Sequence, residues 1–189
     1  TQEEFATIKS AGEQNKKTTE PLTNYLIARV SQDFDKGTTV IGGIFTATNR
    51  SIKEPQLNFI PNAAYTGGLH AIHFWNNKTY YLSARAVISS VNGSKEAIDY
   101  LQRSPARYYQ RPDNEYVTYD TSRTSLSGYG GTLEFGKAGT GNWQFLTYLT
   151  MRSPGLDFND AGYLKQADEI QQLFWLRYRK YKPFGVFRW

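Results

Sequence analysis

Apolar and polar residues alternate along much of the chain, and this period of two is that of a β-strand. In the clearest segment, residues 79–91, one face would carry Tyr80, Leu82, Ala84, Ala86 and Ile88. The opposite face would carry Tyr81, Ser83, Arg85 and Ser89. Similar patterns predict strands at residues 23–34, 38–50, 67–75, 128–137, 142–153 and 170–181. The sequence therefore predicts an all-β fold, an antiparallel meander of about eight strands.

The connections between these strands alternate between short and long. Tight turns such as DKG at residues 35–37 follow one strand, and long polar segments such as residues 92–127 follow the next. Strands of about 10 residues joined in this way are typical of a transmembrane outer-membrane β-barrel, whose turns face the periplasm and whose loops face outside. Within the long segment, Ser94 is a candidate N-cap ahead of apolar residues at helical spacing, so one short helix is expected in this loop.

The two ends of the chain set the expected domain boundaries. Residues 1–20 are polar and predict a loop lead-in, whereas residues 21–189 predict a β-barrel segment. After the turn KPFG at residues 182–185 only VFRW remains. A strand that crosses a membrane needs about 9–11 residues. We therefore expect the barrel segment to be incomplete at both ends.

Aromatic residues make up 15% of the chain although its mean hydropathy is polar. Many of them lie beside the predicted short turns, namely Phe34, Trp75, Tyr80, Phe135, Trp143, Tyr181 and Phe184. Such a row is typical of the aromatic girdle at a membrane interface, although aromatic residues also favour strands in general. Arginines on the predicted strands are candidates for a polar lumen, namely Arg29, Arg85, Arg177 and Arg179.

Several kinds of chemistry find no support in the sequence. The chain has no cysteine, which excludes disulfides and thiolate metal sites. Its net charge is +5, but the basic residues are scattered, so no nucleic-acid partner is expected. The two histidines, His70 and His73, would face opposite sides of a strand and could not chelate one metal. With no recognisable catalytic motif, we expect neither enzyme activity nor a cofactor.

Two loop segments contain candidate binding residues. The run ARYYQRPD at residues 106–113 interleaves arginine with tyrosine, and its candidate ligand-binding residues are Arg107, Tyr108, Tyr109 and Arg111. These side chains could stack on a sugar, or they could pack within the loop. Asp157, Asn159 and Asp160 could supply oxygen ligands to a hard cation. Polar side chains between strands more often form turns, so no metal site is predicted.

Five runs resemble those of a known family: NYLIARVSQD, IGGIFTATNR, ARYYQRPD, GYGGTLEFGKAGTGNWQF and RSPGLDFNDAGYLKQAD. They are similar to the domain-of-unknown-function 5916 family of Bacteroidetes-type bacteria, and the last run is the most specific. The resemblance covers most of residues 21–187. It implies a protein in which a domain like carbohydrate-binding module family 9 precedes a C-terminal outer-membrane barrel, and it lies within the barrel part. It implies no catalytic residues.

Two functional hypotheses follow. The first is a segment of a β-barrel protein in the bacterial outer membrane, acting in transport or as a surface platform without catalysis. Its partners would be outer-membrane lipid and other outer-membrane or surface proteins. The alternative is a soluble all-β carbohydrate-binding module that uses loop aromatics to bind a glycan. Detergent dependence of the full-length protein separates the two, and an enzyme is the least supported reading.

Overall fold

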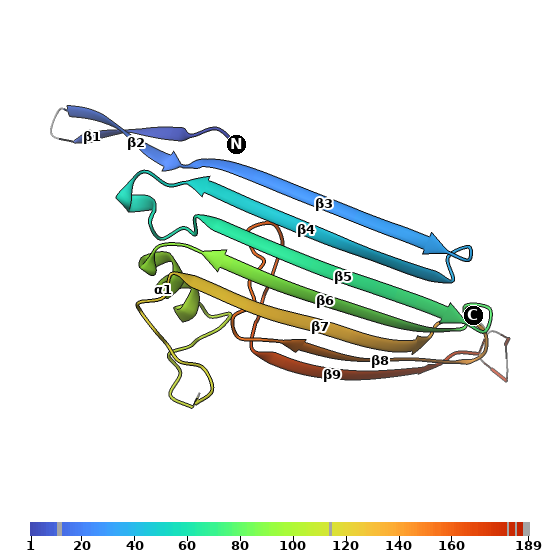
Figure 1. The fold of residues 1–189 in the computed structure, drawn as a ribbon. Coiled ribbons are helices and arrows are strands. Elements are labelled where there is room, and N and C mark those ends of the chain that lie inside the picture. Colours follow the sequence, from blue (N-terminus) through green and yellow to red (C-terminus); the bar gives the residue numbers. More distant parts are fainter. Residues whose placement is uncertain (11–12, 114, 181, 184, 187–189) are drawn as a thin grey trace.

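The structure is a computed structural model that describes residues 1–10, 13–113, 115–180, 182–183 and 185–186 (Figure 1). Its strands are β1 (Glu4–Ser10), β2 (Glu13–Glu20), β3 (Leu22–Phe34), β4 (Thr39–Ser51), β5 (Ala63–Trp75), β6 (Tyr80–Asn92), β7 (Ser125–Lys137), β8 (Trp143–Arg152) and β9 (Glu169–Tyr178). The helices are the 3₁₀ helix η1 (Pro55–Leu57) and α1 (Lys95–Arg103). β1 and β2 form a two-stranded sheet, and β3 to β9 form a seven-stranded antiparallel meander. The predicted all-β class is confirmed, as is the short helix in a long loop.

Short turns lie at one end of the seven-stranded sheet, and the long connections lie at the other (Figure 1). Between β3 and β4, Asp35 and Lys36 have φ values of 51° and 55°, and Gly37 has a φ of 78°. The carboxylate of Asp33 accepts a hydrogen bond from the Gly37 N–H at 2.5 Å. Left-handed residues of this kind match the twist of a tight hairpin, so the sequence prediction of short turns here is confirmed.

The beginning of the chain differs from the sequence prediction. Residues 1–20, predicted as a loop lead-in, instead contain the hairpin of β1 and β2, in which Phe5 pairs with Thr18 and Ile8 with Asn15. Most of its side chains are polar and exposed, so the hydrophobic alternation that reveals a strand is missing. Backbone hydrogen bonds between the two strands hold the hairpin together.

One strand boundary also differs from the sequence prediction. β5 begins at Ala63, earlier than the predicted start at Gly67, because its first residues pair on both sides with β4 and β6. Tyr181 and Phe184, predicted to belong to the aromatic girdle, and Trp189, predicted to lie in an incomplete last strand, are outside the described residues.

The strand register gives the seven-stranded sheet two different faces. One cross-strand row consists of Val30, Gly43, Leu69, Ala86, Gly131, Met151 and Ile170. A row on the other side consists of Ser31, Gly42, His70, Arg85, Thr132, Thr150 and Gln171. We call these sides the apolar face and the polar face. The alternation predicted in β6 is confirmed, because Leu82 and Ile88 are exposed on one side whereas Ser83 and Ser89 are buried on the other.

Two clusters of buried residues lie at the long-connection end. The first consists of Ala64, Val91, Ile98, Tyr109 and Leu126, so that α1 packs on polar-face residues of β5, β6 and β7. The second consists of Leu156, Leu164 and Ala167, which pack against Val87 and Phe158. The polar face is therefore covered at this end, while Arg29 and Arg85, farther along it, are exposed.

Helix α1 begins as the sequence predicts. The hydroxyl of Ser94 accepts a hydrogen bond from the Ala97 N–H at 3.0 Å, which satisfies one of the free N–H groups of the first turn. It also donates to the carbonyl oxygen of Asn58 at 2.5 Å, which joins the helix to the connection between β4 and β5. Among the described residues, no helix has the length and apolar character needed to cross a membrane.

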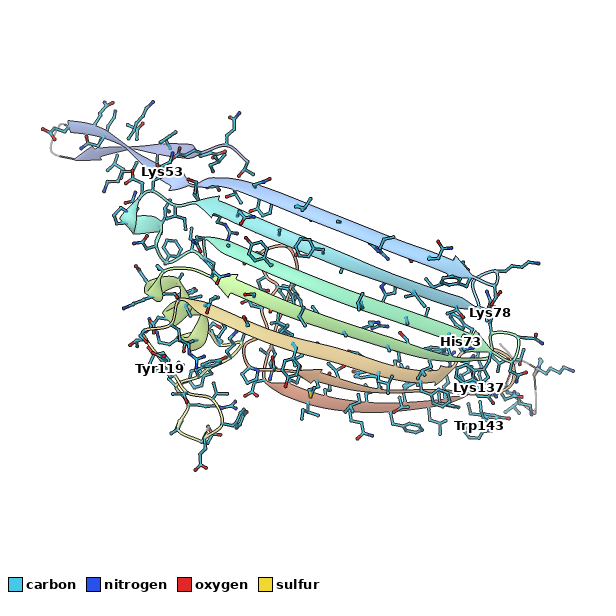
Figure 2. All side chains as sticks on the ribbon, in the orientation of Figure 1. Lys53, His73, Lys78, Tyr119, Lys137 and Trp143 are labelled. Atoms are coloured by element: carbon cyan, nitrogen blue, oxygen red, sulfur yellow. The ribbon has the colours of Figure 1, made fainter. Side chains whose placement is uncertain are left out.

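Aromatic side chains form a row on the apolar face beside the short turns (Figure 2). The ring of Trp75 stacks with those of Tyr80 and Phe135, at centroid distances of 6.1 and 5.9 Å. Phe135 contacts Phe145 at 5.4 Å. The register places Phe34 and Trp143 on the same face and at the same end of the sheet. The predicted position of these aromatic residues beside the short turns is confirmed.

Candidate functional site on the polar face

The connection between β8 and β9, residues 153–168, lies directly on the polar face; we call it the crossing loop. In Figure 1 it passes behind the middle strands. A Cβ atom on Gly128 of β7 would lie 2.0 Å from the backbone nitrogen of Leu156. A Cβ atom on Gly155 would lie 2.1 Å from the carbonyl oxygen of Ser127. Glycine at both positions therefore permits a backbone-to-backbone approach that no other residue would allow.

The crossing loop extends from β7 toward β4. The N–H of Asp157 donates to the hydroxyl of Ser89 in β6 at 2.9 Å, and the side chain of Leu156 is 1% exposed. Farther along, the carboxylate of Asp160 lies 2.5 Å from the guanidinium of Arg50 in β4. The loop is therefore anchored to the face at several strands, which is unlike a connection that projects into solvent.

A buried ion pair joins the crossing loop to the connection between α1 and β7. The guanidinium of Arg107 pairs with the carboxylate of Asp157, and their side chains are 1% and 2% exposed. Arg107 also donates to the carbonyl oxygen of Leu156 at 2.8 Å and to the hydroxyl of Ser104 at 3.2 Å. Buried charges are tolerated when they are paired and hydrogen-bonded in this way, so the pair fixes the two loops in one arrangement.

A second set of contacts lies closer to solvent. The N–H of Ala167 donates to the carbonyl oxygen of Ala106 at 2.9 Å. The carboxylate of Asp168 accepts from Arg111 at 2.5 Å and from the hydroxyl of Tyr116 at 2.6 Å. This hydrogen bond to Asp168 raises the pKa of Tyr116, because it favours the neutral phenol. The two loops thus form one unit over the polar face.

The four candidate ligand-binding residues do not share one surface. Arg107 and Tyr109 are buried, at 3% and 5% exposed, and burial raises the pKa of Tyr109. Tyr108 is 51% exposed and has a φ of 52°. The guanidinium of Arg111 is turned toward Tyr116 and Asp168. The first two residues hold the loops in place, and only Tyr108 and Arg111 remain accessible to a ligand.

The candidate oxygen ligands are engaged in the protein itself. Besides its pairing with Arg107, Asp157 accepts from the N–H of Asn159 at 2.8 Å, and the Asn159 side chain accepts from the N–H of Leu164 at 2.6 Å. Asp160 pairs with Arg50. Across the described residues, no group of three or more acidic, histidine or cysteine side chains could hold a metal ion. These residues shape the crossing loop.

The histidines lie as predicted, on opposite faces of β5. His73 is on the apolar face, where its Nδ1 lies 2.7 Å from the hydroxyl of Thr39 and its ring lies 6.1 Å from that of Trp75. His70 is on the polar face. Sequence reasoning missed Arg50 and Ser89 as anchors of the crossing loop, since both contacts join distant parts of the chain.

These features define a class of protein: an all-β chain whose antiparallel sheet has one apolar and one polar face, with a loop folded onto the polar face. The family model described as a domain of unknown function, DUF5916, matches residues 1–189, and the chain belongs to this family. No curated protein and no solved structure matches the chain.

Proposed function

We propose that the chain is part of the wall of a β-barrel in a bacterial outer membrane, where it serves transport or forms a surface platform and carries out no catalysis. The observation that carries this proposal is the contrast between the two cross-strand rows, of which one contains Val30, Leu69 and Ile170 and the other contains His70, Arg85 and Gln171. In the proposed barrel the apolar face contacts lipid and the polar face lines the lumen, as is usual in such barrels.

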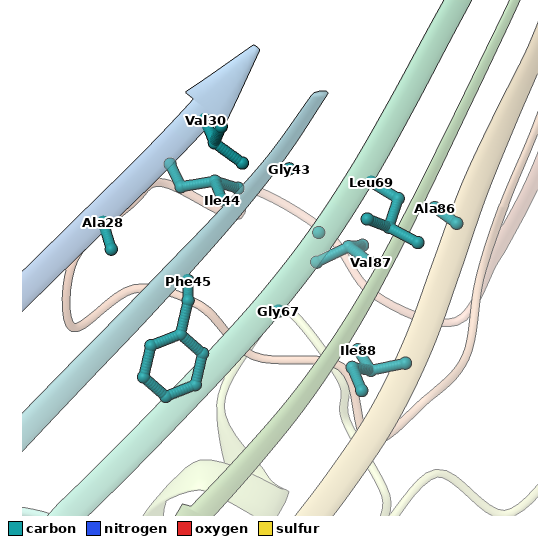
Figure 3. A pocket seen from close by; sticks show the side chains of 11 residues that line it. Ala28, Val30, Gly43, Ile44, Phe45, Gly67, Leu69, Ala86, Val87 and Ile88 are labelled. Carbon is teal, nitrogen blue, oxygen red and sulfur yellow. The ribbon is translucent and has the colours of Figure 1, made fainter. Parts of the chain in front are cut away.

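The exposure of the apolar face supports lipid contact. Val30, Leu69 and Ile88 are 73%, 70% and 65% exposed. They border a shallow hollow of about 460 Å³ that is floored by small residues, among them Gly43 and Gly67 (Figure 3). A large exposed apolar surface is unfavourable in water, whereas hydrocarbon chains would cover it without cost in hydrogen bonds.

The short-turn end has the composition of a membrane interface. Lys78 and Lys137 both lie at this end (Figure 2); the ammonium group of Lys137 is 5.6 Å from the ring centroid of Tyr80 in the aromatic row, and that of Lys78 is 6.0 Å from the ring centroid of Phe74 on the polar face. Lysine and amphipathic aromatic side chains both favour the headgroup region, where an apolar body and a polar end are each solvated. Lys36, in the first short turn, adds a further positive charge at this end.

The crossing loop supports a lumen on the polar side. In the proposed barrel it would enter the lumen from the outer end and narrow it, since it lies across strands β4 to β7. Loops folded into the interior are a common way to restrict such channels. The solutes that pass would then be small and polar, because the face that remains open carries Arg29, Arg85, Thr132 and Gln171.

The two edges of the seven-stranded sheet set a further requirement for the proposed barrel. Within the described residues, β3 and β9 each have one neighbouring strand. An unpaired strand edge is costly in hydrocarbon, because its N–H and C=O groups find no partners there. The proposal therefore requires that both edges gain a neighbour in the membrane.

Tag insertion in the full-length protein tests the proposed topology. An epitope inserted after Glu115, in a long connection, should be stained on intact cells. An epitope inserted after Gly37, in a short turn, should be stained only after the outer membrane is permeabilised, while both proteins fractionate with that membrane. Staining in the reverse order, or recovery of the untagged protein in a detergent-free soluble fraction, would contradict the proposal.

We propose as a second candidate that the loops bind a glycan through Tyr108 and Arg111. The supporting observation is that Tyr108 is held in an exposed, left-handed conformation between two buried neighbours. Replacing Tyr108 by alanine should abolish binding on a glycan array without changing the fold, because its ring is outside the packed core. Equal binding by this variant and the native protein would exclude the aromatic contact.

A further inference from the structure

A second hollow lies on the polar face, next to the crossing loop. It has a volume of about 440 Å³, and the side chains around it include Arg29, Ser83, Arg85, His70, Ile72 and Val87. Val87 also packs against the cluster formed by Leu156. The hollow therefore lies beside the part of the polar face that the crossing loop covers. In the proposed barrel it would open directly into the lumen.

The basic groups that line this polar hollow come from three strands, β3, β5 and β6. His70 of β5 lies opposite Arg85 of β6. On the other side of His70 is Gly42 of β4, where an added Cβ atom would lie 2.4 Å from the imidazole Cε1. The imidazole therefore lies over a position without a side chain and extends toward β3, the strand that carries Arg29.

The arginines of the polar face differ in their partners, and Arg177 donates to the side-chain oxygen of Gln144 at 3.0 Å. Arg50 and Arg152 each have a carboxylate at 2.5 Å, from Asp160 and Glu169. In the part of the chain that the structure describes, Arg29 has no such partner. The side chain of Arg85 is 58% exposed, and its guanidinium lies 3.3 Å from the carboxylate of Glu134.

We propose that the polar hollow binds a small oxyanion, a carboxylate or a phosphate. Arg29 and Arg85 both line the hollow and Glu134 pairs with Arg85, so the two guanidinium groups leave an excess of positive charge. Guanidinium groups offer paired N–H donors whose geometry fits an oxyanion, and Ile72 and Val87 complete the lining of the hollow.

The inference rests on the proposed function for its place in a lumen, but binding is measured separately from membrane insertion. Full-length protein, purified in the medium that keeps it monodisperse, is titrated calorimetrically with citrate and, in parallel, with pyrophosphate. The double variant R29Q/R85Q is compared with K16Q/K17Q, which removes the same charge from exposed residues of the β1–β2 hairpin. The single variant Arg29→Gln serves as a second test, because its side chain is exposed and its loss leaves the fold intact.

One or both anions should bind the native protein and the hairpin variant alike. Binding to R29Q/R85Q should be at least about tenfold weaker, because two charge-assisted donors are lost, and Arg29→Gln should fall between. Binding of citrate alone would identify carboxylates as the ligand class, and binding of pyrophosphate alone would identify phosphates. Absence of binding for both anions, or an equal loss in the hairpin variant, would overturn the proposal without bearing on the membrane location.

Discussion

At the long-connection end of the sheet, α1 and the crossing loop bury polar-face side chains, and residues such as Val91, Ile98 and Leu156 are no more than 1% exposed. At the short-turn end, by contrast, large apolar side chains remain uncovered; Trp143 and Tyr178, for example, are 53% and 55% exposed. One end is stabilised by contacts within the chain. The other end depends on what surrounds it, because exposed apolar area stabilises a fold only when something other than water covers it.

The two regions of the sheet are therefore stabilised in different ways. Changes at the long-connection end should destabilise the protein in any medium, because they disturb packing that the chain itself supplies. Changes on the apolar face should have their effect only where that face contacts hydrocarbon, as the proposed function requires. The following variants test this distinction, in order of decreasing expected effect.

The largest effect is expected from Asp157→Ala. It would leave the guanidinium of Arg107 buried without its carboxylate, at a cost of about 3–5 kcal/mol in the free energy of unfolding. The matched control is Asp113→Ala, because the Asp113 side chain is 82% exposed and lies 3.8 Å from Arg111. Such a surface pair contributes about 0–1 kcal/mol. Urea unfolding of both variants gives the comparison, and equal losses would mean that the ion pair does not hold the loops.

In lipid, a charge on the apolar face should reduce the free energy of unfolding by nearly as much as Asp157→Ala does. Ala84→Arg places a guanidinium in the middle of β6, and near the bilayer midplane this costs about 2–4 kcal/mol. The control is Gln171→Arg, which lies on the polar face in the neighbouring cross-strand row. Folding into lipid vesicles, followed by urea titration, measures both. Similar free energies of unfolding for the two variants would show that both faces contact the same solvent.

Gly128→Ala should loosen the crossing loop. The new Cβ atom would meet backbone atoms of Gly155 and Leu156 at 2.0–2.5 Å, so the loop must move, at a cost of about 1–3 kcal/mol. Gly67→Ala is the matched control, because its Cβ atom would lie 3.6 Å from the nearest side-chain atom of Ile88. Limited proteolysis should cleave residues 153–168 faster in the first variant alone. Protection of the loop in Gly128→Ala would be inconsistent with the close approach.

The smallest effect is expected at the N-cap of α1. Ser94→Ala removes the acceptor for the Ala97 N–H and should reduce the free energy of unfolding by about 1 kcal/mol. Ser94→Asp keeps an acceptor and should recover most of that loss, although it lacks the donor to Asn58. Thermal unfolding followed by circular dichroism distinguishes the two variants, and identical curves for both would argue against the cap.

The parts of the fold that the sequence predicts are those determined by local alternation. The sequence predicts β6 because Leu82, Ala84 and Ala86 alternate with Ser83 and Arg85. In the structure each of these two sets occupies one face of the sheet. The sequence does not predict the β1–β2 hairpin, since most of its side chains are polar and its large apolar residues, Phe5 and Ile8, are three positions apart and do not alternate. A polar strand held mainly by its backbone hydrogen bonds leaves no hydrophobic period in the sequence.

The candidate site was harder to predict because its contacts are distant in sequence. Arg107 and Asp157 are 50 residues apart, and nothing near either residue identifies the other as its partner. For that reason the run ARYYQRPD indicates a binding surface, whereas Arg107 and Tyr109 in fact hold the loops. The glycines at 128 and 155 are the local signal of the close approach, but a glycine in a strand does not reveal which backbone approaches it.

Contact of one face with lipid is most directly tested by a scan of β6 in the full-length protein in lipid vesicles. The chain has no cysteine, so single cysteines at residues 81–88 can each carry a nitroxide label. Labels at even-numbered residues should be relaxed mainly by oxygen, which concentrates in hydrocarbon. Labels at odd-numbered residues should be relaxed mainly by a water-soluble nickel chelate. Equal accessibility to the two reagents along the strand, or the opposite alternation, would contradict the central claim that the two faces meet different solvents.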